Sequence, residues 1–204
     1  MTYQRWNNLI SKFGITKDDE TYNDLISRYS ENHRFYHTIK HVKHMLEVFD
    51  NNIHLVHNKN EVEMAIWFHD AIYDIQSKSN ELDSALLAKK FLSKHGISKD
   101  IVKRIYDLIL STKHDSNLVD MDQRILTDID LSILGTNEET FDNYELNIRK
   151  EYSTIDKDIY DHERFKILNM FYNKESIYYT NEFTEIYETQ ARYNLKRSIN
   201  QLHA

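Results

Sequence analysis

The chain of 204 residues contains no cysteine, no proline and only three glycines. Without cysteine it can form no disulfide, no thiolate nucleophile and no cysteine-ligated zinc site. A β-rich fold needs more turn residues than this sequence supplies, because hairpins depend on glycine, proline and asparagine turns. We therefore expect an all-α protein. The absence of cysteine also fits a reducing compartment, so we expect a cytoplasmic location.

Long apolar runs and an excess of positive charge are also missing. No stretch approaches the roughly 20 apolar residues of a membrane span, and the N-terminal segment has neither the apolar core nor the cleavage site of a signal peptide. The 26 basic and 33 acidic side chains give a net charge of −7, which disfavours nucleic-acid binding. We expect neither a membrane nor a nucleic acid as a partner. A small anion could still bind a local basic pocket, and the sequence does not indicate an oligomeric state.

Apolar residues recur at the three- and four-residue spacing of amphipathic helices along the whole chain. The predicted helices cover residues 2–13, 18–29, 36–50, 60–74, 79–95, 98–112, 118–134, 137–152, 157–173 and 182–200. Gly14, Gly96 and Gly135 each follow such a run, where a helix C-cap favours glycine. With no repeat or linker, we predict one helical-bundle domain over residues 1–204. Its metal-site core would cover about 30–135, with the helices of 137–200 packed on it.

The segment WFHDAIYD, residues 67–74, places a histidine and an aspartate on the predicted helix 60–74. On a helical wheel His69 shares the face of Val62 and Ile66, and Asp70 lies on the flank of that face. Burying an imidazole beside a carboxylate is unfavourable unless both are satisfied. A hydrogen-bonded core pair would do so, and the pair alone favours this interpretation. A divalent metal bound by both side chains is the functional alternative.

Four of the 11 histidines lie between residues 33 and 44. On the predicted helix 36–50, His37 and His41 are four residues apart, so both imidazoles can point at one site. A solvated polar face is the favoured interpretation for His33 and His44. Arg34 lies one turn before His37, where a guanidinium could bind a phosphate with two hydrogen bonds.

Two segments further along the chain add candidates. STKHD offers Lys113 and His114 at a predicted helix end. ILTDIDLSILG places Asp128 and Asp130 in an otherwise apolar helix, roughly 200° apart around its axis, so at most one of them faces inward. Asp130 lies at the edge of the apolar stripe and is the better ligand candidate. Asp128 lies on a more polar strip and is expected to be a supporting or surface group.

The order His37, His69-Asp70, Asp130 resembles the H…HD…D signature of the HD superfamily. The wider pattern is similar to one branch of it, the uncharacterised, predicted metal-dependent HD phosphohydrolases, through RFYHTIKHV, AIWFHDAIYD, NELDSA, STKHD, DIDLSILG, YELNIRKEY and ETQARYNL. The resemblance spans most of the chain. It implies an all-helical bundle and a divalent ion held by His37, His69, Asp70 and Asp130. Two imidazoles and two carboxylates suit Mn²⁺, Fe²⁺, Mg²⁺, Ni²⁺ or Zn²⁺.

The reaction that this resemblance implies is metal-assisted hydrolysis of a phosphate ester. We expect the substrate to be a small phosphorylated metabolite or nucleotide, because a net charge of −7 without a block of lysines and arginines offers no basic track for a polymer. Asp70 would orient the attacking water or take its proton. Arg34 and Lys113, with His41 or His114, would neutralise charge on the phosphoryl oxygens.

Glu81, in NELDSA, could order a water or a second ion, or could be an exposed charge near a helix start. Two other functions stay open. One is a dinuclear-iron HD oxygenase, which would need extra ligands such as His41 and His114. The other is a non-catalytic module that senses a nucleotide or a metal.

Overall fold

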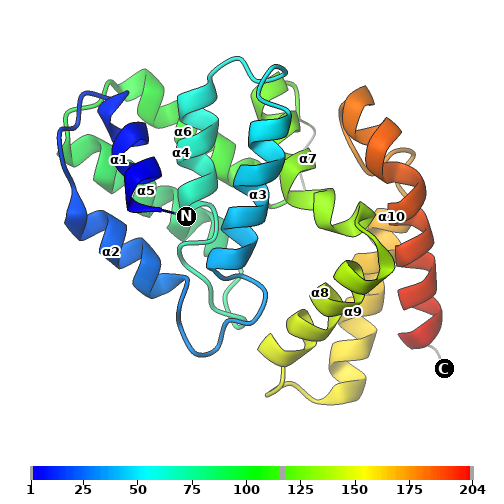
Figure 1. The fold of residues 1–204 in the computed structure, drawn as a ribbon. Coiled ribbons are helices and arrows are strands. Elements are labelled where there is room, and N and C mark those ends of the chain that lie inside the picture. The colour runs from blue at the N-terminus through cyan, green and yellow to red at the C-terminus, as the bar shows by residue number, and fades with distance from the viewer. Residues whose placement is uncertain (1, 115–117, 203–204) are drawn as a thin grey trace. The chain divides into compact units, whose positions relative to one another are not determined.

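The computed structural model describes residues 2–114 and 118–202, and within them it confirms the all-α prediction. It contains ten α-helices and one short 3₁₀ helix, with no strand in the described ranges (Figure 1). The chain divides into two compact units, Met1–Ile129 and Asp130–Ala204, and the boundary falls inside one helix, α7 (Met121–Leu131). The prediction that residues 1–204 form one domain stays a prediction. None of the helices in the described part is both long enough and apolar enough to cross a bilayer.

The first unit is built around one buried helix, α4 (Lys59–Phe68). The residues from Met64 to Phe68 are all fully buried, because α4 packs against α1, α3, α5 and α6 (Figure 1). An ion pair between Glu61 on α4 and Arg104 on α6 joins two of these helices at 2.7 Å. The other helices that begin in this unit are α1 (Tyr3–Ser11), α2 (Asp19–Arg28), α3 (Ile39–Asn51), α5 (Asn80–Lys94), α6 (Lys99–Ser111) and α7 (Met121–Leu131).

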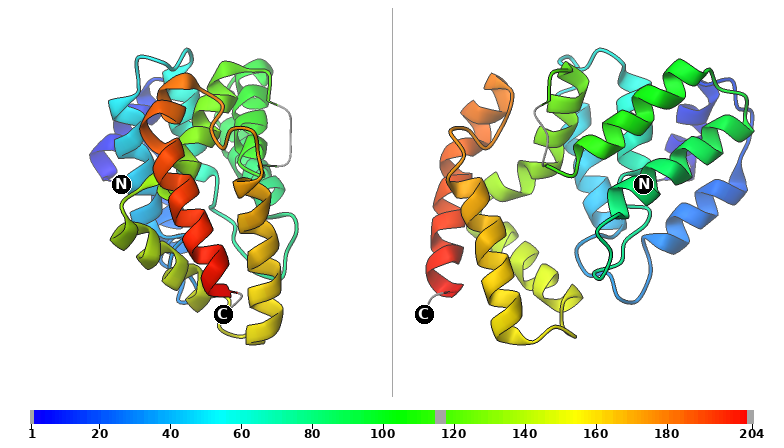
Figure 2. Two further views of the ribbon diagram at one scale, coloured as in Figure 1. Left: turned by 90° about the vertical axis from the view of Figure 1, so that its right-hand side faces the viewer. Right: turned by 180° about the vertical axis from the view of Figure 1, so that it is seen from behind.

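The second unit contains a 3₁₀ helix, η1 (Ser132–Gly135), and the helices α8 (Glu138–Glu151), α9 (Lys157–Tyr172) and α10 (Asn181–Leu202). Helix α10 packs along α9 and against η1. Both views of Figure 2 show α10 beside α9. The buried amide of Asn194 donates to the carbonyl oxygens of Leu134 and Thr136 at 2.9 and 2.8 Å. These bonds satisfy the carbonyls that the end of η1 leaves open and fix α10 beside it.

Two of the three glycines have the predicted role and one does not. Gly14 and Gly96 adopt φ values of +76° and +70°, the left-handed conformation that ends a helix. Gly135 is the last residue of η1 and has no positive φ, so it does not end its helix in this conformation. A Cβ at Gly135 would lie 2.6 Å from the Cβ of Tyr187 and 2.7 Å from its carbonyl oxygen. Gly135 is therefore needed for the close approach of η1 and α10.

Two predicted helix boundaries near the candidate site are wrong, and hydrogen bonds of side chains to the backbone explain both. Helix α4 ends at Phe68, not at residue 74. The amide of Ile72 donates to the hydroxyl of Ser84 on α5 at 3.0 Å, and that of Asp74 donates to the side chain of Asn80 at 3.0 Å. These amides are therefore not available to continue the helix. Helix α3 begins at Ile39, because the hydroxyl of Thr38 caps its first turn.

Candidate metal centre

His69 occupies the C-cap position of α4 and is 1% exposed. Its Nδ1 lies 3.0 Å from the carbonyl oxygen of Ile66. A carbonyl oxygen can only accept, so Nδ1 carries the hydrogen and the Nε2 of the neutral ring carries a lone pair. That Nε2 lies 2.8 Å from Oδ2 of Asp70 and 3.1 Å from Nε2 of His41. A lone pair facing a carboxylate needs a cation between them, either a proton on His69 or a metal ion.

His41 lies on the first turn of α3 and is 4% exposed. Its Nε2 is 3.1 Å from that of His69 and 3.5 Å from Oδ2 of Asp70. The ring of Tyr36 lies against it, with centroids 4.7 Å apart. Two imidazole nitrogens and a carboxylate oxygen thus converge on one small volume.

Asp130 completes this cluster from α7. One ligand atom each from His41, His69 and Asp130 lies within 4.8 Å of the others, so these three residues can hold a metal ion. Asp130 is half-buried. It follows directly after Ile129 on a helix that continues to Leu131. We call His41, His69, Asp70 and Asp130 the metal cluster.

Charge around Asp70 favours its ionised form. Burial alone would raise the pKa of Asp70, but the neighbouring imidazoles of His69, His37 and His41 hold it below its ordinary value. The cluster also lies at the C-terminal end of α4, where the helix dipole stabilises positive charge. The ionised carboxylate of Asp70 and the C-terminal end of α4 both favour a cation at this position.

Arg34 has a different surrounding from the one that a phosphate-binding role needs. Its guanidinium is buried and donates to the carbonyl oxygens of His37, Asp70 and Ala71 at 3.2, 2.6 and 3.1 Å. Its Nε donates to Glu31 at 2.9 Å. These bonds use four of the five N–H groups of the side chain. Arg34 thus ties the turn before α3 to the turn after α4 and holds the backbone of Asp70 in place.

His37 lies in the turn before α3, not on a helix as predicted. Its ring stacks on that of Tyr73, with centroids 4.1 Å apart, and lies 6.1 Å from the ring of His41. It is close enough to influence Asp70, but His41 rather than His37 belongs to the group that can hold a metal. Ligation by His37 stays a prediction. His33 is exposed, and its Nε2 lies 3.0 Å from the carbonyl oxygen of Tyr73.

The remaining candidates occupy three places. Lys113 and His114 follow α6, the first exposed and the second half-buried with φ of +60°. Glu81 lies in the first turn of α5 and is half-buried. Participation of these three in the site stays a prediction. Asp128 is fully buried on α7, so the expectation that it could be a surface group is wrong. Its other expected role, as a group that supports the site, stays a prediction.

Sequence reasoning missed three residues that shape the site. Tyr29 donates its hydroxyl to the carbonyl oxygen of Trp67 at 3.1 Å, next to His69. Tyr73 provides the ring on which His37 stacks. Ser84 accepts the amide of Ile72 and so helps to end α4. No spacing rule indicates such roles, because each depends on contacts between separate elements.

Comparisons of the chain with family models, with curated proteins and with solved structures gave no match. The resemblance to the HD superfamily therefore rests on the sequence motifs.

Proposed function

We propose that this protein is a divalent-metal-dependent phosphohydrolase that acts on a small phosphorylated metabolite or nucleotide. The observation that carries the proposal is the orientation of His69. Its Nδ1 is bonded to the carbonyl oxygen of Ile66, and its Nε2 faces Oδ2 of Asp70 at 2.8 Å. Metal-ligating histidines characteristically donate their second ring nitrogen to a carbonyl or carboxylate in this way.

The donor set fits a divalent ion. The metal cluster offers two imidazole nitrogens and two carboxylates from its four residues, a mixed nitrogen and oxygen set suited to Mn²⁺, Fe²⁺, Ni²⁺, Zn²⁺ or Mg²⁺. Four protein ligands would leave positions open on an octahedral ion. When bound, a divalent ion supplies Lewis acidity toward water and toward a phosphoryl oxygen.

The residues around the cluster have separate tasks in this proposal. Asp70 keeps part of its side chain exposed, 17%, so the carboxylate oxygen that does not face His69 can orient a water and accept its proton. Lys113 and His114 are the candidates to neutralise charge on the phosphoryl oxygens. Arg34 holds the backbone of Asp70 rather than the substrate, because four of its five N–H groups are already bonded.

The test is a screen of phosphorylated metabolites and nucleotides for phosphate release. The full-length protein is first depleted of metal and then loaded separately with Mn²⁺, Mg²⁺, Ni²⁺, Fe²⁺ or Zn²⁺. Activity that requires one of these ions and is lost in Asp130→Asn supports the proposal. His54→Ala, which changes an exposed histidine outside the cluster, is the matched control and should keep full activity.

Metal-independent release, or release that Asp130→Asn leaves unchanged, would contradict the proposal. Measuring the number of ions bound per chain separates a single-ion hydrolase from the dinuclear-iron oxygenase, which requires two irons.

A further inference from the structure

A cavity of about 670 Å³ lies on the first unit between α5 and α6. Seen from behind, these two helices face the viewer (Figure 2, right). The cavity lies beside the turn around Gly96 that joins α5 to α6, because Ser93, Ile97 and Lys99 line it. Small-molecule sites commonly measure about 300–1,000 Å³, so this cavity has the size of a ligand site. None of its lining residues belongs to the metal cluster.

Three lysines line the cavity: Lys89, Lys99 and Lys103. Lys103 is paired with Asp107 on the same helix. Lys89 and Lys99 form no ion pair with a carboxylate anywhere in residues 2–114 and 118–202. The chain as a whole carries a net charge of −7. Two lysines without carboxylate partners therefore make the cavity locally positive on a negatively charged protein. A positive cavity attracts an anion.

Besides Ser93 and Asp107, whose carboxylate is paired with Lys103, the other lining groups are apolar or aromatic. Val102 is 6% exposed and Ile97 is half-buried. The ring of Tyr106 is half-buried, and the Nζ of Lys89 lies 5.8 Å from its centroid. An aromatic ring and aliphatic side chains next to lysine heads offer a surface for the apolar part of a ligand and a counter-charge for its head.

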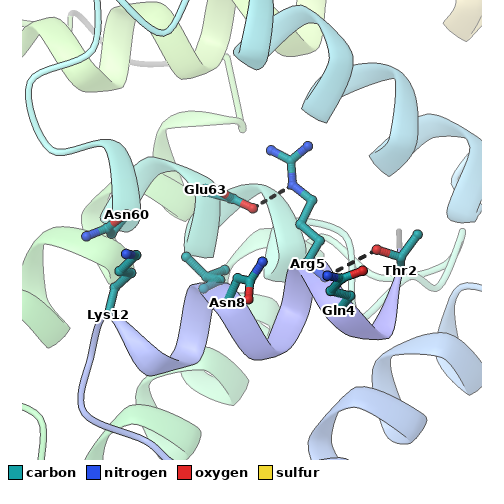
Figure 3. Close-up of a pocket in the computed structure, with 8 residues that line it drawn as sticks. Thr2, Gln4, Arg5, Asn8, Lys12, Asn60 and Glu63 are labelled. Atoms are coloured by element: carbon teal, nitrogen blue, oxygen red, sulfur yellow. Dashed lines mark hydrogen bonds and ion pairs between the residues drawn. The ribbon is translucent and has the colours of Figure 1, made fainter.

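A second cavity, lined by Arg5 and Lys12 among others, contains an arginine whose charge is already paired. It measures about 400 Å³ and lies between α1 and α4 (Figure 3). Its arginine, Arg5, donates to Glu63 at 2.7 Å and pairs with Asp50 at 2.7 Å. The arginine is thus already neutralised by two carboxylates of the protein itself, in contrast to Lys89 and Lys99.

We propose that the cavity between α5 and α6 binds a small amphipathic anion, with its acidic head at Lys89 and Lys99 and its apolar body against Tyr106 and Val102. A nucleotide and a fatty acid share this chemistry. The site is separate from the proposed metal cluster. Its ligand would therefore bind whether or not a metal is present.

The experiment uses the full-length protein and 1-anilinonaphthalene-8-sulfonate, an aromatic anion whose fluorescence rises on binding. N-phenyl-1-naphthylamine, which has the same rings without the sulfonate, is the neutral comparison. The double variant Lys89→Gln, Lys99→Gln removes the two unpaired charges, and Lys90→Gln, Lys196→Gln is a matched control because it removes two exposed lysines elsewhere. Ser93→Trp fills the cavity and leaves its charges unchanged.

We expect one molecule of the anionic probe per chain and weaker binding of the neutral one. Each exposed lysine contributes about fivefold in affinity, so the double variant should lose about 25-fold while the control pair loses none. Ser93→Trp should abolish binding. All altered side chains are exposed, and thermal unfolding checks that each variant is folded.

Equal affinity for the two probes would overturn the proposal, as would equal affinity of the two double variants or undiminished binding to Ser93→Trp. Competition with AMP and with laurate then distinguishes a nucleotide from a fatty acid, and displacement by neither would also contradict it. Metal affinity should stay unchanged in every variant, so this proposal and the proposed phosphohydrolase activity can fail separately.

Discussion

The guanidinium of Arg34 donates to the carbonyl oxygen of Asp70 at 2.6 Å. The two residues are 36 positions apart in the chain, and this bond joins the turn before α3 to the turn after α4. The arginine side chain is completely buried. The geometry of the metal cluster therefore depends on a residue that does not belong to it.

Arg34→Ala should reduce both stability and metal affinity. Leaving three carbonyl oxygens without their donor lowers the free energy of unfolding by about 2–4 kcal/mol, and loss of a residue that positions a ligand weakens metal binding about 10- to 100-fold. Arg34→Lys should have a stability and a metal affinity between those of the wild type and Arg34→Ala, because lysine keeps the charge but not the planar guanidinium. Chemical denaturation and metal titration measure the two effects.

The control for this prediction is Arg28→Ala, which removes an arginine paired with Asp24 on its own helix. It should change neither quantity appreciably. An Arg34→Ala protein with wild-type metal affinity and depressed hydrolysis would instead favour the phosphate contact that the sequence predicts.

The two aspartates of α7 should respond differently to loss of charge. Asp130 belongs to the group that can hold a metal and is half-buried, whereas Asp128 is fully buried. Asp130→Asn should weaken metal binding about tenfold or more. Asp128→Asn should mainly lower the free energy of unfolding, by roughly 1–3 kcal/mol, because its buried contacts are disturbed. Isothermal titration and thermal unfolding of both variants decide the order. The reverse order would make Asp128 the ligand.

Gly135→Ala should destabilise the second unit. The new Cβ would lie 2.6 to 2.9 Å from backbone and Cβ atoms of Tyr187 on α10, and such overpacking costs about 1–3 kcal/mol. Thr189→Ala, at an exposed position of α10, serves as the control and should leave the unfolding curve in place. An unchanged unfolding midpoint for Gly135→Ala would show that η1 and α10 are not so closely packed.

The pair of Asp18 and His95 should make stability depend on pH in acid. Burial alone would raise the pKa of Asp18, but the amide of Thr21 and the ring of His95 hold it below its ordinary value. A lowered folded-state pKa means that the carboxylate stabilises the protein above about pH 4. That stabilisation is lost as the pH falls through the lowered pKa. Urea denaturation between pH 6 and pH 2 should therefore show a smaller acid loss for Asp18→Asn than for the wild type, and equal losses would contradict the assignment.

Helical periodicity predicted the existence of all ten helices, because each buries a stripe of apolar residues whose spacing is local information. It also predicted that Gly14 and Gly96 follow the ends of helices, and both adopt a positive φ there. The end of α4 could not be predicted in the same way. It depends on Ser84 and Asn80, which take the amides that would continue the helix.

The candidate site was predicted only in part, because local sequence patterns do not show contacts between separate elements. His69, Asp70 and Asp130 carry the motif, and the structure places all three in the metal cluster. That His41, and not His37, belongs to the group that could hold a metal was not predicted, because the helix begins at Ile39 and the ring of His37 stacks on Tyr73 in the turn before it. The role of Arg34 was missed because its acceptors are backbone carbonyls, which sequence patterns do not reveal.

Metal binding by His69 is the central claim, and the number of divalent ions per chain tests it most directly. Metal-depleted wild type and His69→Ala are each equilibrated with Mn²⁺, and bound metal is measured by elemental analysis, with the melting temperature of both apo-proteins as a check on folding. We predict one tightly bound ion for the wild type and none for the folded variant. Equal metal content in the two proteins, or none in either, would contradict the account.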